Sequence, residues 1–125
     1  MPDSPTPIAL GFHHVAINVS DVPRAILFYE SVFGLRQMER ENSGASTPTG
    51  AWFAVGSLQL HLQGRPPGAA KSDQHFALEL TSHTGLAERA AACGGRFETA
   101  RPLPGYPFRA NVYDPDGNRI EVLAR

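Results

Sequence analysis

Residues 14–19 read His-Val-Ala-Ile-Asn-Val, and 61 residues later residues 75–80 read His-Phe-Ala-Leu-Glu-Leu. Both stretches follow one pattern: histidine, apolar, alanine, apolar, polar, apolar. The regular alternation of apolar and polar side chains is typical of a β-strand that is buried on one face. The chain therefore contains an internal repeat, and each copy of the repeat begins with a strand.

Each repeated strand is followed by the signals of a helix. In the first copy Ser20-Asp21 supplies a cap for a helix that Gly34 ends, and in the second Thr81 or Ser82 is positioned to cap a helix that Gly94-Gly95 ends. Three shorter strand-like runs follow each helix, at about residues 35–41, 51–55 and 58–62 in the first copy and 96–100, 108–113 and 119–123 in the second. The pattern predicts an α+β fold of two tandem βαβββ modules.

The chain has 125 residues, which is the length of one domain. The proline-rich residues 1–10 predict a flexible N-terminal tail, and residues 11–125 predict a single domain. Within that domain we expect the modules at about 11–63 and 74–125, with a linker at 64–73.

Composition excludes several classes of function. Eleven basic residues oppose twelve acidic ones, and neither sign is concentrated in one stretch, so we expect neither a nucleic-acid partner nor a membrane-surface partner. No apolar run has the length of a membrane span or the form of a signal peptide. The single cysteine, Cys93, cannot form an internal disulfide, and this favours a reducing, cytoplasmic location.

Four side chains of the metal-ligand type occupy equivalent positions in the two copies. His14 and His61 lie 47 residues apart in the first copy, and His75 and Glu121 lie 46 residues apart in the second. Because successive side chains of a strand point to opposite faces, all four are expected on the polar face of their strands. Three imidazoles and one carboxylate suit one divalent metal ion, and Zn, Ni, Co, Fe(II) and Mn(II) all remain possible.

The sequence also resembles a known family. Residues 14–21, with Phe28-Tyr29 and Phe33-Gly34-Leu35, resemble the opening motif of the vicinal oxygen chelate superfamily (glyoxalase, bleomycin resistance protein and extradiol dioxygenase), and residues 113–121 resemble its closing motif. The resemblance spans about residues 11–124. It implies that each module forms a curved mixed sheet and that two modules close a cup around a metal, whose ligands in glyoxalase I match His14, His61, His75 and Glu121.

The resemblance implies a metal-dependent lyase or isomerase of the glyoxalase I type, acting on a small carbonyl or thiol-adduct substrate. Glu121 would be the catalytic base that moves the substrate proton. His61 departs from the bacterial enzymes of this type, which have a glutamate there. Residues 104–107 read Pro-Gly-Tyr-Pro, where enzymes that use glutathione tend to have lysine and glycines, and Ala16 replaces the threonine of the thiol transferases.

Two other functions remain open. An extradiol-type iron(II) dioxygenase would use three ligands that match His14, His75 and Glu121, and a metal-free protein of the bleomycin-resistance type would bind a drug or metabolite without chemistry. Superfamily members of this length usually form homodimers, so we expect one here. If the modules swap between chains, each site would combine His14 and His61 of one chain with His75 and Glu121 of the other.

Overall fold

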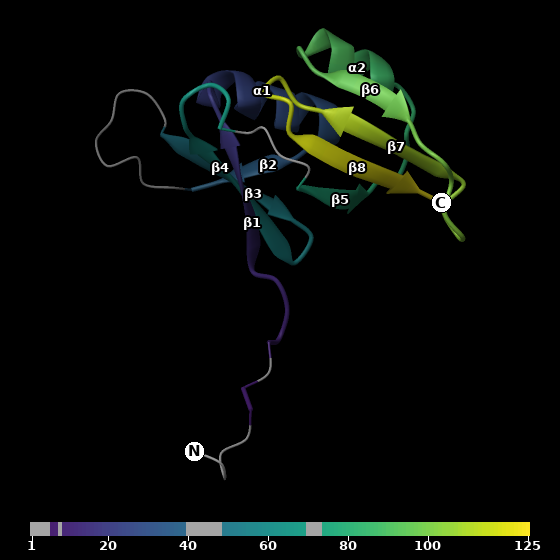
Figure 1. Cartoon of the computed structure of the whole chain (residues 1–125), viewed down its shortest axis with the longest axis horizontal. Coiled ribbons are helices and arrows are strands. Elements are labelled where there is room, and N and C mark those ends of the chain that lie inside the picture. Colours follow the sequence, from purple (N-terminus) through teal and green to yellow (C-terminus); the bar gives the residue numbers. More distant parts are fainter. Residues whose placement is uncertain (1–5, 8, 40–48, 70–73) are drawn as a thin grey trace.

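The computed structural model describes residues 6–7, 9–39, 49–69 and 74–125. Its elements follow the order β1 (His14–Val19), α1 (Val22–Phe33), β2 (Arg36–Met38), β3 (Gly50–Val55), β4 (Leu58–Gly64), β5 (His75–Glu79), α2 (Leu86–Ala92), β6 (Arg96–Thr99), β7 (Phe108–Tyr113) and β8 (Arg119–Ala124). This is βαβββ twice over, and the predicted α+β fold of two tandem modules is confirmed (Figure 1).

Each module forms a four-stranded mixed sheet of the same topology. The strand order is β1-β4-β3-β2 in the first sheet and β5-β8-β7-β6 in the second. In both sheets the first strand of the module pairs in parallel with the last, and the remaining pairs are antiparallel. Strands β1 and β5 therefore each lie at one edge of their sheet, with β2 and β6 at the other edges.

Helix α1 begins and ends as its sequence predicts. The side chain of Asp21 accepts a hydrogen bond of 3.0 Å from the backbone N–H of Arg24, which caps the first turn. Gly34 ends the helix in the left-handed conformation, with φ at 67°, which glycine adopts without steric cost. The buried residues of α1 include Phe28 and Tyr29, so the helix covers the apolar face of its sheet.

Helix α2 begins differently from the prediction. Its N-cap is Gly85, and no side chain caps it; the prediction that Thr81 or Ser82 would cap this helix was wrong. The hydroxyl of Ser82 instead accepts a hydrogen bond of 3.1 Å from the backbone N–H of Thr84. The Ser82 hydroxyl therefore accepts from the backbone of a turn that precedes the helix, and it does not cap the first turn of α2.

The strand after α1 is shorter than predicted, because β2 covers only Arg36–Met38. Residues 40 and 41 of the predicted strand lie outside the described residues, as do residues 70–73 of the predicted linker. Within the described part of the chain, no helix has the length and apolar character needed to cross a membrane.

One hydrophobic core joins the two modules. Its buried members come from both sheets and both helices and include Phe28, Phe53, Leu86, Val112 and Ile120. Hydrogen bonds also cross between modules: Asp116 accepts from the backbone N–H of Ser20 at 3.1 Å, and Asn118 donates to the carbonyl of Asn18 at 2.9 Å. The opposite, polar faces of the two sheets remain available for a site.

Candidate metal site

The first candidate pair, His14 on β1 and His61 on β4, lies together on the first sheet. In the parallel register His14 is opposite Gln59, so His61 lies two residues further along the neighbouring strand. The two imidazole rings are stacked, with centroids 4.1 Å apart and planes at 11°. This contact agrees with the prediction that His14 and His61 lie on the same, polar face of the sheet.

The ring of His61 lies between two other rings. Trp52, which is opposite His61 in the β3–β4 register, stacks on it with centroids 4.5 Å apart and planes at 11°. Because β4 lies between β1 and β3, the order of the rings is His14, His61, Trp52. An alternating strand pattern places Trp52 on the polar face, but the sequence alone does not indicate the stacking.

Gln59 holds the His61 ring from its edge. The Gln59 Oε1 atom lies 2.8 Å from Nε2 of His61. An amide oxygen only accepts hydrogen bonds, so Nε2 of His61 is the donor in this contact. The ring is thus held by stacking on its faces and by a hydrogen bond at its edge.

The second candidate pair, His75 on β5 and Glu121 on β8, has the same register in the second sheet. His75 is opposite Arg119, so Glu121 lies two residues further along β8, and the carboxylate Oε1 is 3.3 Å from Nε2 of His75. In both modules the residue opposite the last-strand ligand is an alanine, Ala16 in the first and Ala77 in the second. The internal repeat therefore extends to the geometry of each pair.

Arg109 of β7 is the strongest electrostatic partner of Glu121. Its Nε donates a hydrogen bond of 2.9 Å to Oε2 of Glu121. This bond, with a smaller contribution from the charge of His75, holds the pKa of Glu121 below its usual value although partial burial acts in the opposite direction. The Glu121 side chain is 12% exposed, so it is a partly buried, charged group that faces a basic neighbour.

The two pairs lie on different sheets of the chain. Within the described residues, no group of three or more His, Cys, Asp or Glu side chains is arranged to hold a metal ion. The structure thus brings His14 to His61 and His75 to Glu121, but it does not bring the four side chains together in one chain. The donor types fit a divalent cation, and a single chain presents them as two separate pairs of candidate ligands.

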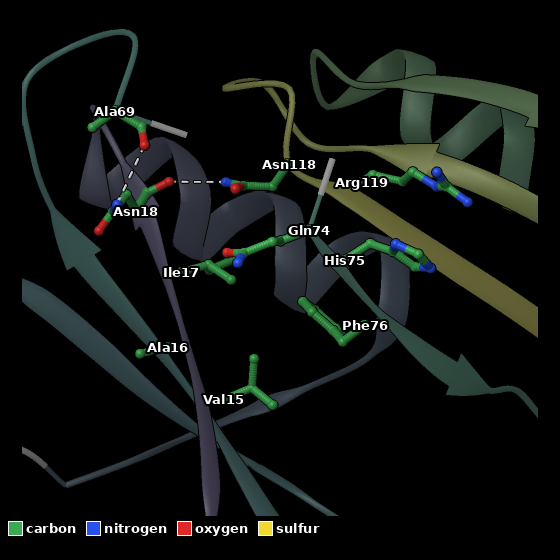
Figure 2. Close-up of a pocket in the computed structure, with 10 residues that line it drawn as sticks. All are labelled: Val15, Ala16, Ile17, Asn18, Ala69, Gln74, His75, Phe76, Asn118 and Arg119. Atoms are coloured by element: carbon green, nitrogen blue, oxygen red, sulfur yellow. Dashed lines mark hydrogen bonds between the residues drawn. The ribbon is translucent and has the colours of Figure 1, made fainter. Parts of the chain in front are cut away.

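A cavity of about 290 Å³ lies where β1 of the first sheet faces β5 and the start of β8 of the second (Figure 2). Its lining consists of Val15, Ala16, Ile17, Asn18, Ala69, Gln74, His75, Phe76, Asn118 and Arg119. Of the four candidate ligands, only His75 borders it. Figure 2 shows the side chains of His75 and Arg119 extending next to each other from β5 and β8.

Sequence comparison finds a family and relatives for this chain. The model of the Glyoxalase/Bleomycin resistance protein/Dioxygenase superfamily matches residues 11–122. An uncharacterized protein of Pseudomonas aeruginosa is 32% identical over 86% of this chain and 84% of its own length. A lactoylglutathione lyase of Arabidopsis thaliana is 28% identical over 91% of this chain, which spans only 44% of the plant enzyme.

Solved structures share the fold at lower sequence identity. The fosfomycin resistance protein FosX of Listeria monocytogenes, solved in complex with Mn(II) and a sulfate ion, superposes with a TM-score of 0.73. The match covers 94% of this chain and 91% of FosX, at 18% identity. A protein of the same fold has therefore been solved with a divalent metal.

Proposed function

Because the chain belongs to the Glyoxalase/Bleomycin resistance protein/Dioxygenase superfamily, we propose that it is a metal-dependent lyase or isomerase of the glyoxalase I type. Its substrate is a small carbonyl compound or thiol adduct. The observation that carries the proposal is the repeated register of His14 with His61 and of His75 with Glu121. Two equivalent ligand pairs, one from each module, would together supply the four ligands of one metal centre.

The complete site belongs to a homodimer. Each metal is held by His14 and His61 of one chain and by His75 and Glu121 of the partner subunit. This arrangement follows from the two separate pairs, because a two-ligand site binds a first-row divalent ion weakly and the single chain keeps its pairs on separate sheets. A second copy supplies the missing pair without rearranging the shared core.

A bound divalent ion supplies Lewis-acid polarisation of a substrate carbonyl oxygen. The protein supplies the base: Glu121 takes a proton from the hydroxyl-bearing carbon next to the carbonyl and returns it to the carbonyl carbon. The proton of that hydroxyl passes to the former carbonyl oxygen, so the carbonyl group moves by one carbon and no atom is gained or lost. Arg109 holds the Glu121 carboxylate in its charged form. Gln59 and Trp52 hold the ring of His61 in one orientation.

One contact favours a second candidate, an extradiol-type iron(II) dioxygenase. Gln59 occupies Nε2 of His61, and a ligand set without His61 would consist of His14, His75 and Glu121. Two histidines and one carboxylate with open coordination positions are the ligands of non-haem iron(II) oxygenases. The identity of the metal that supports activity separates the two candidates.

The decisive experiment mixes two inactive variants. One chain carries His14→Ala and His61→Ala, and the other carries His75→Ala and Glu121→Gln. If the sites are shared between chains, a dimer of either variant with itself has two ligands in each site. A mixed dimer instead has one site with all four ligands and one site with none. We expect each variant alone to lose bound metal and the mixture to recover it in one site per mixed dimer, as measured by elemental analysis.

Three outcomes would contradict the proposal. Failure of the mixture to recover metal would exclude a site shared between chains. Activity that depends on iron(II) and consumes oxygen would replace the lyase with the dioxygenase. Wild-type protein that binds no divalent metal would leave the metal-free ligand-binding function.

A further inference from the structure

We infer that His13 is a positioning residue for the candidate metal ligand His14. The imidazole of His13 accepts a hydrogen bond from Nδ1 of His14, which leaves Nε2 of His14 as the nitrogen with a free lone pair. The inference rests on the proposed function, because a positioning residue acts through the ligand that it holds. It adds to the site a residue that the repeat of the two candidate pairs does not reveal.

The backbone holds His13 directly before β1 and against β4. Its carbonyl accepts a hydrogen bond of 3.2 Å from the backbone N–H of Gln59. Strict alternation along an extended chain would place the side chains of His13 and His14 on opposite faces. The structure instead brings the two imidazoles together, with their Nδ1 atoms 3.0 Å apart, ring centroids 5.2 Å apart and planes at 85°.

Stacking on His61 fixes the plane of the His14 ring but not its edge. A half-turn about the bond between Cβ and the ring would keep the stack of 4.1 Å, while it exchanges Nδ1 with a ring carbon. This torsion of histidine has a roughly two-fold preference, and His13 and His14 are both exposed in the single chain, so core packing does not select one orientation. The contact with His13 does, because it forms only when Nδ1 of His14 faces Nδ1 of His13.

The same contact selects the position of the proton on His14. In a neutral imidazole one nitrogen donates and the other accepts, so one of the two Nδ1 atoms carries the shared proton. When His14 is the donor, its Nε2 keeps the lone pair that a metal needs. A histidine that binds a metal usually donates its other N–H to a neighbouring acceptor, which fixes both the ring and the tautomer. His14 and His61 thus each have a partner at one ring edge, His13 and Gln59.

The first test measures the tautomer of His14 in metal-free protein. Long-range proton–nitrogen correlation spectra, recorded at about pH 8.5 where an ordinary imidazole is neutral, show which ring nitrogen carries the proton. We expect the Nδ1–H form for His14 in the wild type. His13→Phe keeps a ring but removes the acceptor, so the Nδ1–H population should fall. His13→Asn places an amide oxygen near the position of Nδ1 and should restore that population.

The second test measures Zn(II) affinity through the fluorescence of Trp52, which stacks on His61. His13→Phe should lower the affinity about 10-fold or more, as is typical when the partner of a metal ligand is lost. His13→Asn should retain most of the affinity, because it keeps an acceptor. His83→Phe is the matched control: His83 is also exposed but stacks on Phe108, and its replacement should leave the affinity unchanged.

Three results would overturn the inference. The first is an Nε2–H tautomer of His14 in the metal-free wild type, and the second is unchanged affinity in His13→Phe. The third is an equal loss in His13→Phe and His13→Asn, which would make His13 itself a ligand. Wild-type protein that binds no Zn(II) defeats the proposed function instead, and the spectra, recorded without metal, still decide whether His13 sets the state of His14.

Discussion

The hydroxyl of Tyr29 in α1 donates a hydrogen bond of 2.8 Å to Oδ2 of Asp114, in the turn between β7 and β8. Asp114 also accepts from the backbone N–H groups of Asp116 and Asn118 and from the Asn118 side chain, each at 2.9 Å. One buried carboxyl group thus shapes the turn that leads into β8 and ties it to the helix of the other module. Because β8 carries Glu121, this contact also helps to position the His75–Glu121 pair.

Replacing Tyr29 with phenylalanine should destabilise the protein without removing the fold. The change deletes the donor of the hydrogen bond to Asp114, while the other three donors of that carboxyl remain. We expect the free energy of unfolding to fall by about 1–2 kcal/mol, measured by urea denaturation. Ser31→Ala, at an exposed position of the same helix, is the control, and an equal loss in that variant would refute the role of the hydroxyl.

The stability of the protein should depend on the titration of Asp114. Burial raises the pKa of this carboxyl above its usual value, and the hydrogen bonds from Asn118 and Tyr29 only partly oppose the shift. Because the pKa in the folded state is higher than in the unfolded state, the contribution of Asp114 is fully present below the unfolded pKa and is lost as pH rises through the folded pKa.

The measurement compares wild type with Asp114→Asn, which does not titrate at this position. Urea denaturation from acidic to neutral pH gives the free energy of unfolding of both proteins. The wild-type value minus the variant value should fall as pH rises through the folded pKa and should be constant above it. A difference that rises over this range would contradict the raised pKa.

Replacing Gln59 with leucine should weaken metal binding if His61 is a ligand. The substitution removes the hydrogen bond that orients the His61 ring, and loss of a group that holds a metal ligand typically lowers affinity by about 10-fold to 100-fold. Trp52, the one tryptophan of the chain, stacks on His61, so its fluorescence reports the titration of metal-free protein with Zn(II).

Gln63→Leu is the matched control, since Gln63 lies on the same strand and face and accepts a hydrogen bond from Arg65. Its affinity for Zn(II) should equal that of wild type. Unchanged affinity in Gln59→Leu would point to the three-ligand set of His14, His75 and Glu121.

Replacing Gly95 with alanine should be more costly than a glycine replacement at the surface. A Cβ at position 95 would collide with the carbonyl oxygen of Tyr113 and with the ring of Phe28, both of which are fixed in the packed interior. We expect a loss of about 3 kcal/mol in the free energy of unfolding. Gly105→Ala meets no atom within 4 Å and carries only the strain of its positive φ of 81°, so it should lose about 1 kcal/mol.

Much of this protein could be predicted from local patterns along the chain. The alternation of His14 to Val19 and of His75 to Leu80 indicated strands, and the cap at Asp21 and the glycine at position 34 indicated the limits of α1. The start of α2 was less predictable, because the Ser82 hydroxyl can either cap a helix or accept from a backbone N–H in a local turn. The backbone conformation decides between the two, and here the hydroxyl accepts from Thr84. The stacking of Trp52 on His61 depends on cross-strand register, which alternation alone does not specify.

The sequence by itself determined the two modules and the face of the strand on which each candidate ligand lies, because the side-chain period of a β-strand is a local property of the backbone. Only the tertiary structure decided how the candidate ligands are distributed: two pairs on two sheets, joined by a shared core and by contacts such as Tyr29 with Asp114. The relative position of two sheets depends on packing between residues far apart in the chain, and no local pattern encodes that packing.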